Sequence, residues 1–453
     1  MCYPERSMQY HPRNKNMILG MLIEAVYYSQ VITGESNTQL LAALRDVVEH
    51  CTACGRCMAN CPVKIPSGEV ALSLRAFLDH EGAGGHPIKE RVLEFLQADI
   101  ANRVPKAAKM ASIGQKMQNR FLGFLPQVWK QRFESPIFSG RGPKMGYTNL
   151  YESLKLARGN VFLPHAFTEG MPLALYFPGC GGSLFYDRIG ISSLMLLLTA
   201  GYAVAIPPRH LCCGYPLLAA GMDTAYEDTL AECRQQLSEM LRKASRRKFD
   251  ISLLVTSCGT CLDSLGRLNL QDSFPSLQQQ DVVQAVLPHL DRRLLTLPQE
   301  AKTMLYHGAC HCEWAGLHRV KGQPQIVAQL SQSTGYDVRL HPGCCGESGM
   351  GSITSPAIYN QLRARKEQAL SQSFAEGYQG PVLVGCPSCK IGIGRCLINL
   401  GEKRQVLHVA EWLAGLIDGE DRRQSFRKRV NETRGELRVV EMPNHSRGTH
   451  VER

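Results

Sequence analysis

Residues 173–180 read LALYFPGC, a run of five apolar residues that ends directly in proline, glycine and cysteine. A short apolar run closed by turn residues indicates a buried strand, here with a cysteine just past its carboxyl end. Segments of helix and strand character alternate beyond it, which predicts an α/β fold with a mostly parallel sheet. The expected elements are a helix over 192–200, a strand over 202–206, a helix over 230–243 and a strand over 251–256.

The same order of elements recurs in the second half of the chain. Three cysteine landmarks are separated from their counterparts by nearly one spacing, which indicates an internal repeat of one module. The pairs are Cys180 and Cys310, Cys212 and Cys344, and Cys258 and Cys386. The matching elements are strands over 303–306, 336–340 and 381–384 and helices over 327–333 and 358–374.

Each copy carries five cysteines: one after a strand, an adjacent pair followed by glycine, and a C-x2-C pair at a strand end. One tetrahedral zinc ion needs only four ligands, whereas adjacent cysteines can bind two irons of a multinuclear cluster. Open α/β sheets gather ligands at strand carboxyl ends, so two copies would place two sites across a shared interface. A thioredoxin-like C-x2-C pair among buried cysteines is the alternative. The candidate ligands are Cys180, Cys212, Cys213, Cys258 and Cys261, and Cys310, Cys344, Cys345, Cys386 and Cys389.

A further run near the N-terminus, Cys51, Cys54, Cys57 and Cys61 followed by Pro62, has the spacing C-x2-C-x2-C-x3-C-P. This is the spacing of a bacterial ferredoxin site, whose thiolates bind a 4Fe-4S cluster. A zinc ribbon would separate two C-x2-C pairs by a longer loop. In two-cluster ferredoxins the fourth cysteine serves the other cluster. The sequence therefore leaves open whether Cys61 or a remote cysteine completes this site.

Composition favours a globular protein of a reducing compartment. The chain has 453 residues, 44% of them hydrophobic, and 18 cysteines that mostly cluster, as metal or redox sites do. The net charge is +11, and a basic segment over 101–158 is suited to an acidic protein or an anionic membrane surface. The uncharged run 189–208 is split by Gly201 and predicts a buried helix and strand, and no secretory signal is apparent. We expect a cytoplasmic protein, peripheral attachment to the inner face of the cell membrane, and no nucleic-acid partner.

The cysteine pattern over 170–418 resembles the CCG-domain family of Fe–S oxidoreductases. That family includes the CCG-bearing subunits of heterodisulfide reductase and of anaerobic glycerol-3-phosphate dehydrogenase, and the iron–sulfur subunit of glycolate oxidase. The segment from Pro4 to Pro12 and the run from His50 to Val63 are more loosely similar to the iron–sulfur part of bacterial FAD-linked D-lactate or D-2-hydroxyglutarate dehydrogenases.

The resemblance implies one Fe–S cluster in each CCG module, of the non-cubane 4Fe-4S type in heterodisulfide reductase. The distances from Cys213 to Cys258 and from Cys345 to Cys386 are longer than usual, so the cluster type stays open. It also implies electron transfer from a partner FAD-linked dehydrogenase toward quinone or another carrier. No nucleotide-binding motif is found, so flavin and NAD are expected on the partner. A catalytic subunit that reduces a disulfide at a CCG cluster is the alternative, and a zinc scaffold without redox activity is a third reading.

These expectations divide the chain into five parts. They are an α-helical ferredoxin-like domain with the 4Fe-4S site over 1–100, a basic connector with short helices over 101–170, a first CCG module over 171–302, a second CCG module over 303–418, and a basic C-terminal tail over 419–453.

Overall fold

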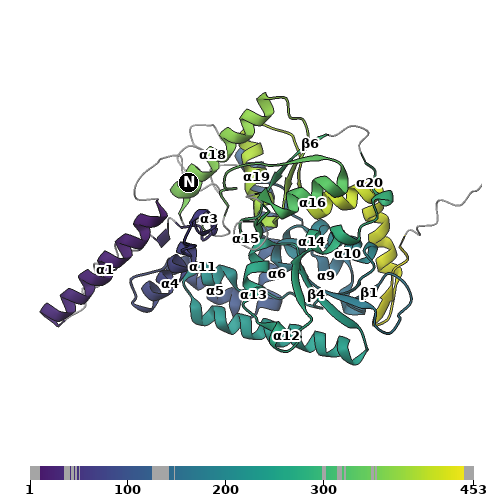
Figure 1. The fold of residues 1–453 in the computed structure, drawn as a ribbon, viewed down its shortest axis with the longest axis horizontal. Helices are drawn as coiled ribbons and strands as arrows, with labels where there is room; N and C mark the ends of the chain where they lie inside the picture. Colours follow the sequence, from purple (N-terminus) through teal and green to yellow (C-terminus); the bar gives the residue numbers. More distant parts are fainter. Residues whose placement is uncertain are drawn as a thin grey trace, which may run out of the picture.

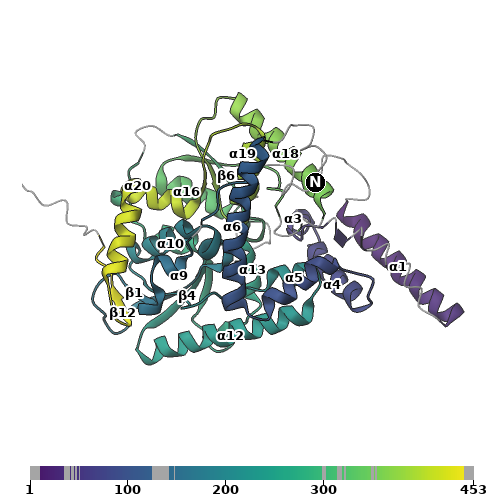
Figure 2. The same ribbon diagram turned by 180° about the vertical axis from the view of Figure 1, so that it is seen from behind.

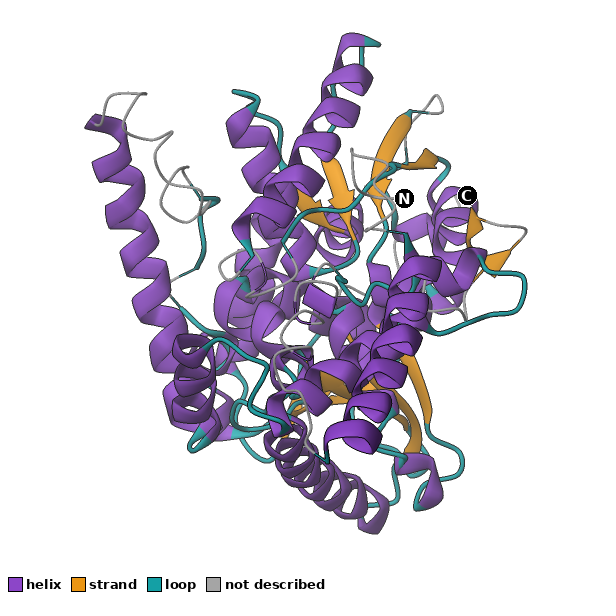
Figure 3. Ribbon diagram, turned by 90° about the vertical axis from the view of Figure 1, so that its left-hand side faces the viewer, coloured by secondary structure: helices purple, strands orange, loops and turns teal. Residues whose placement is uncertain are grey.

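The computed structural model shows two α/β units joined to a group of N-terminal helices (Figure 1). It describes residues 11–34, 41, 45, 48–49, 51–124, 142–146, 148–297, 302–313, 319–320, 323–347, 351 and 355–442. Figure 3 shows the strands in two main groups, with helices between and around them.

The first unit is built around a sheet with the strand order β12-β1-β3-β2-β4-β5. Strands β3, β2, β4 and β5 are parallel to one another, whereas β1 and β12 (Leu437–Val439), which are parallel to each other, run antiparallel to them. Residues 173–177 of β2 are all buried, as expected for an apolar strand covered on both faces. The strands are β1 (Val161–Leu163), β2 (Pro172–Phe177), β3 (Ala203–Ala205), β4 (Asp250–Thr256) and β5 (Gln278–Asp281). The helices are α10 (Asp187–Thr199), α11 (Tyr215–Ala220), α12 (Asp223–Arg246), α13 (Gly259–Gly266) and α14 (Val282–Val286).

The second unit repeats this arrangement with the all-parallel order β11-β10-β6-β9. Strands β9, β6, β10 and β11 take the places of β3, β2, β4 and β5, so the internal repeat is confirmed. The strands are β6 (Thr303–His307), β9 (Asp337–Leu340), β10 (Val382–Val384) and β11 (Val406–His408), with a short β7 (Arg319–Val320) and β8 (Gln323–Pro324) pair. The helices are α15 (Cys310–Glu313), α16 (Gln325–Thr334), α18 (Pro356–Ala375), α19 (Pro387–Asn399) and α20 (Val409–Glu432).

The two units share their hydrophobic core. Side chains on opposite faces of a strand enter different layers, because successive residues alternate. Leu173 and Val384 lie in one layer, and Tyr176 and Leu383 in the other, so each layer contains residues of both units. The last helix, α20, packs against α10 of the first unit. This continuous packing holds the carboxyl ends of the two sheets together.

The N-terminal helices are α1 (Pro12–Thr33), α3 (Arg56–Asn60), α4 (Ser67–His80) and α5 (Pro87–Gln97). Helix α1 ends at its cap residue Gly34, which has the left-handed conformation that glycine adopts readily. Helix α1 projects from the body (Figure 1), whereas α4 packs against α11 of the first unit.

The expectation of only short helices in the connector was wrong. Helix α6 (Ile100–Phe124) is a single helix of 25 residues. Pro105 is tolerated because it lies near the helix start and removes one hydrogen bond, while Ala108 and Ser112 on the following turns are buried. Strand β1, in the same region, was not predicted, since three residues are too short to show a period.

The expected C-terminal tail also contains regular structure. Helix α20 runs across residue 418, and β12 (Leu437–Val439) pairs in parallel with β1. The domain boundaries themselves stay predictions. Within the described part of the chain, the helices are too short or too polar to span a bilayer.

Candidate metal centres

In the first unit, five predicted thiols converge at the carboxyl ends of three strands. Cys180 follows β2, Cys212 and Cys213 follow β3, and Cys258 caps α13 directly after β4. The sulfurs of Cys213 and Cys261 are 3.6 Å apart. Burial raises the pKa of the Cys180 thiol to about 12, and the charges of Cys213 and Cys386 raise it further. The five thiols therefore form one group beside the point where the sheet order reverses, with Cys213, Cys258 and Cys261 buried and Cys180 and Cys212 half-buried.

The glycine of each Cys-Cys-Gly triplet explains how the adjacent thiols are presented. Gly214 and Gly346 both have positive φ, +73° and +67°, a conformation that favours glycine. In both copies its amide donates to the sulfur of the first cysteine of the triplet, Cys212 or Cys344, at 3.4 Å. The two triplets thus have the same local geometry.

Gly179 lies close to the thiols of the first unit and leaves no room for a side chain. Its φ is +59°, and a Cβ atom at this position would lie 2.7 Å from the sulfur of Cys261. A larger residue would therefore both strain the backbone and displace a thiol of the C-x2-C pair.

In the second unit, four predicted thiols are joined by direct interactions. Cys345 interacts with Cys344 and Cys389, and Cys389 interacts with Cys386. Cys310 begins α15 directly after β6, the place that Cys180 has after β2. A ring nitrogen of His307 and the sulfurs of Cys345 and Cys389 all lie within 4.8 Å of one another.

The two thiol groups meet at the interface between the units. The sulfurs of Cys258 and Cys386, which occupy equivalent positions in the repeat, are 3.6 Å apart. Each of these residues caps a helix, α13 or α19, whose N-terminal dipole favours a thiolate. The expectation that the two sites face each other across a shared interface agrees with this arrangement.

The N-terminal run surrounds the short helix α3. Burial raises the pKa of Cys57, and the charges of Cys54 and Cys51 raise it further, so these three thiols lie close together. Cys61 differs from these three, because hydrogen bonds from backbone N–H groups lower its pKa, and the N–H group of Ile65 has the largest effect. The structure therefore groups the first three thiols, and whether Cys61 completes their site stays open.

Contacts that the sequence did not reveal attach this run to both units. The Arg75 guanidinium on α4 donates to the carbonyls of Cys51 at 2.5 Å, Val48 at 2.8 Å and Ala219 of α11 at 2.9 Å. The Ser355 hydroxyl, at the start of α18, donates to the Glu49 carboxylate at 3.3 Å. Such contacts join residues far apart in the sequence, so no local pattern could have indicated them.

The residues after the two triplets differ, with tyrosine at 215 and glutamate at 347. The Tyr215 hydroxyl lies 3.3 Å from Nε2 of His311, and Nδ1 of that ring lies 3.1 Å from Asp263, which links α13 to α15. Glu347 takes the equivalent place in the second unit and forms a buried ion pair with Arg395 at 3.3 Å. The two centres therefore have different polar surroundings.

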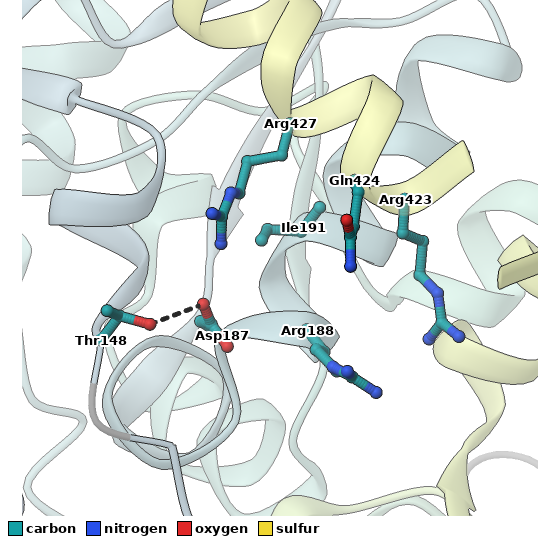
Figure 4. A pocket seen from close by; sticks show the side chains of 7 residues that line it. All are labelled: Thr148, Asp187, Arg188, Ile191, Arg423, Gln424 and Arg427. Atoms are coloured by element: carbon teal, nitrogen blue, oxygen red, sulfur yellow. Dashed lines mark hydrogen bonds between the residues drawn. The ribbon is translucent and has the colours of Figure 1, made fainter. Parts of the chain in front are cut away.

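A separate pocket of about 420 Å³ lies between α10 and α20 (Figure 4). Arg188, Arg423 and Arg427 line it, together with Asp187, whose carboxylate accepts a hydrogen bond from Thr148 at 3.3 Å. Its described lining contains no cysteine, so it is distinct from the thiol groups.

The thiol groups fit iron–sulfur clusters on their donor chemistry. Iron–sulfur clusters are held by cysteine thiolates, and the three groups supply cysteine sulfur as the main donor. None of the sixteen cysteines whose side chains the structure describes forms a disulfide. The five-thiol groups exceed the needs of a single tetrahedral zinc ion.

Comparison with known proteins agrees with this chemistry. Residues 174–266 and 304–394 match the family CCG, described as a cysteine-rich domain. An uncharacterized iron–sulfur protein of Methanocaldococcus jannaschii is 20% identical, over 81% of this chain and 61% of that protein. Lactate utilization protein A of Oceanobacillus iheyensis is 23% identical, over 52% of this chain and 94% of that protein.

A subunit of fumarate reductase (CoM/CoB) from Methanothermobacter marburgensis is 21% identical, over 76% of this chain and 56% of that protein. The chain spans 61% and 40% of two iron–sulfur relatives, from Methanocaldococcus jannaschii and Methanococcus maripaludis. Two matches to the cysteine-rich domain and equivalent thiols in both copies show that the chain contains two CCG domains, and it is similar to proteins named as iron–sulfur proteins, as lactate utilization protein A and as a fumarate reductase (CoM/CoB) subunit.

Proposed function

We propose that this chain is the iron–sulfur electron-transfer subunit of a flavin-dependent dehydrogenase. A partner FAD-linked subunit would oxidise a 2-hydroxyacid, such as D-lactate, glycolate or D-2-hydroxyglutarate, or glycerol-3-phosphate. The electrons would then pass through this chain toward quinone or another carrier. The name of the lactate utilization relative supports a hydroxyacid donor. The observation that carries the proposal is the 3.6 Å approach of Cys258 and Cys386, which joins two buried thiol groups into one path.

We assign ligand roles to fourteen cysteines in three centres. A bound cluster would supply one-electron chemistry in each centre, and the protein positions the thiolates and buries six of the ten in the two modules. The contacts of Arg75 and Glu49 hold the N-terminal run against both modules, which would bring all three centres within one assembly. The assigned ligands are Cys51, Cys54, Cys57 and Cys61; Cys180, Cys212, Cys213, Cys258 and Cys261; and Cys310, Cys344, Cys345, Cys386 and Cys389.

Anaerobic purification with iron analysis and electron paramagnetic resonance tests this proposal. Three four-iron centres predict about twelve iron atoms per chain, signals from more than one reduced centre, and co-purification of a flavoprotein that reduces them when given its hydroxyacid. A preparation with zinc, or with no more than about one iron per chain, would contradict the assignment.

A second candidate is a catalytic subunit that reduces a disulfide at a CCG centre. It is favoured by the convergence of both thiol groups at the interface between modules, and by the fumarate reductase (CoM/CoB) relative. Two electrons and two protons would convert the disulfide to two thiols. Turnover of a heterodisulfide with reduced viologen dye as the donor, without any flavoprotein, would favour this candidate over the first.

Helix α6 supports peripheral attachment to an anionic membrane. It has five Lys or Arg residues and no Asp or Glu, and it lies on the near face of the molecule in Figure 2. Met110, Met117 and Phe121 are 72%, 68% and 63% exposed and lie on one side of the helix. A basic helix with an exposed apolar stripe is typical of binding in the plane of a membrane surface.

Sedimentation with lipid vesicles tests this attachment. We expect binding to vesicles with anionic lipid, weaker binding at high salt, and loss of binding in Met117→Glu. The matched control Val439→Glu places the same charge on an exposed side chain of β12 and should still bind. Equal binding of wild type and Met117→Glu would contradict a role of α6.

A further inference from the structure

A buried lysine lies behind the thiols of the second module. Lys366 of α18 has no exposed surface, and its Nζ lies 2.5 Å from Nδ1 of His341, 2.7 Å from the carbonyl of Pro342 and 3.2 Å from Nδ1 of His307. An ammonium group has three N–H donors, which these three acceptors can take, and the carbonyl of His341 lies farther away at 3.4 Å.

No carboxylate balances this lysine. Among the described residues, no Asp or Glu forms an ion pair with Lys366. Burial lowers the pKa of Lys366 to about 8, and the charges that act against this are sulfurs: Cys396 first, then Cys345, Cys389 and Cys344. A buried cation is costly without an anion, so thiolates at Cys344, Cys345 and Cys389 of the second centre would stabilise the charge of Lys366.

The contact with Lys366 also determines the tautomer of His307. Because the ammonium donates to Nδ1, the neutral ring carries its hydrogen on Nε2. Nε2 of His307 has no hydrogen-bond partner, although the residue is 2% exposed. Since Nδ1 is occupied, Nε2 is the nitrogen available to the nearby sulfurs of Cys345 and Cys389. The N–H group is thus placed to donate to a thiolate rather than to bind iron through a lone pair.

The first module has no such group on its corresponding helix. The buried side chains of α12, which the structure describes throughout, are Tyr226, Thr229, Leu230, Cys233, Leu237, Ser238, Leu241 and Ala244, and none of them is charged. The buried side chains of α18 include both Arg363 and Lys366. Of these two corresponding helices, only α18 contains buried cations.

We infer that Lys366, acting through His307, makes the second CCG centre the more easily reduced of the two, so that an electron entering the first module moves to the second. This inference rests on the proposed iron–sulfur function. Cationic charge and N–H donation to sulfur stabilise the reduced, more negative form of a buried centre. One electron leaves the first centre and one arrives at the second, and the flavoprotein supplies it. Lys366 and His307 are positioning residues that do not themselves carry the electron.

Potentiometric titration followed by paramagnetic resonance tests the inference in Lys366→Met. We expect full iron content. At a fixed applied potential, the ratio of reduced to oxidised second centre should be at least tenfold lower than in the wild type, which corresponds to a decrease of about 59 mV in its one-electron reduction potential. The other signals should not move. The control Lys403→Met removes an exposed cation of the same module and should leave all centres unchanged. Lys366→Arg keeps the charge and should recover much of the shift.

The role of His307 has its own readout. In the wild-type protein we expect a strongly coupled, solvent-exchangeable proton in the hyperfine spectrum of the second centre, and its loss in His307→Leu with iron retained. Loss of iron in His307→Leu would show that this residue is a ligand, and an unmoved potential in iron-replete Lys366→Met would overturn the inference. If Lys366→Met does not fold, absence of the exchangeable proton in the wild type overturns it equally. Wild-type protein with no more than about one iron would instead refute the proposed function.

Discussion

Replacement of Gly179 by alanine tests the geometry of the first centre directly. The glycine has φ of +59°, and a Cβ atom there would lie 2.7 Å from the sulfur of Cys261. A non-glycine residue in a left-handed conformation costs about 1–2 kcal/mol. In addition, atoms pack at about 3.5–4.0 Å, so the sulfur must move by roughly 1 Å. That displacement breaks its 3.6 Å approach to Cys213.

Gly170→Ala provides a matched control for this experiment. Gly170 also has positive φ, +81°, but no atom lies within 4 Å of the place its Cβ would take, so it shares the backbone strain without the contact. We expect both variants to lose about 1–2 kcal/mol of unfolding free energy, and only Gly179→Ala to lose iron and one paramagnetic signal. The assays are denaturant unfolding and iron analysis after anaerobic reconstitution. Full iron content in Gly179→Ala, with unfolding equal to that of Gly170→Ala, would refute the reasoning.

Three further substitutions test other parts of the structure. Arg75→Met removes the guanidinium donors to three carbonyls and should lower the stability of the N-terminal helices by about 1.5–3 kcal/mol. Faster proteolysis of these helices would show the loss, and unchanged proteolysis would contradict it. Burial raises the pKa of Asp281 to about 7. The folded protein therefore keeps a proton on this carboxyl group that the unfolded chain releases above about pH 4. Because the folded state binds more protons, the free energy of unfolding of the wild type should fall as pH rises from about 4 to 7. Asp281→Asn keeps the hydrogen bond from the Val283 amide and should remove this decline in unfolding free energy, measured across that pH range. Lys390→Met leaves the carboxylate of Glu411, a residue that is 3% exposed, without its ion pair. This substitution should lower the free energy of unfolding in urea by about 3–5 kcal/mol. The double variant with Glu411→Gln removes the unpaired charge and should recover most of the lost free energy of unfolding.

The elements of the two modules were predictable because their signal is local. The run LALYF of β2 and the strand before Cys258 are short, apolar and closed by turn residues, and the structure has both as strands. The equal spacing of the cysteine landmarks indicated the repeat, and the matching strand orders confirm it. Thiol convergence followed from one rule, since all these cysteines stand at carboxyl ends of parallel strands.

The remaining features depend on tertiary contacts. Helix α6 continues through Pro105 because later turns are buried, and β12 joins β1 across more than 270 residues. Lys366 stands in a helix whose charged residues look like a solvated face in the sequence. Only packing against His307 and His341 shows that it is buried.

The residues that the two modules share and the residues that differ between them have different consequences for function. Equivalent backbone geometry at Gly214 and Gly346, and helix caps at Cys258 and Cys386, give both modules the same means of presenting thiols. Identical surroundings would leave an electron with no preference between two such centres. The residues that differ between the copies lie next to those thiols, and of the corresponding helices α12 and α18 only α18 contains buried cations. On the proposed function, the shared residues would form the electron path and the divergent ones would set its direction, so substitution of Lys366 should change a potential without changing iron content.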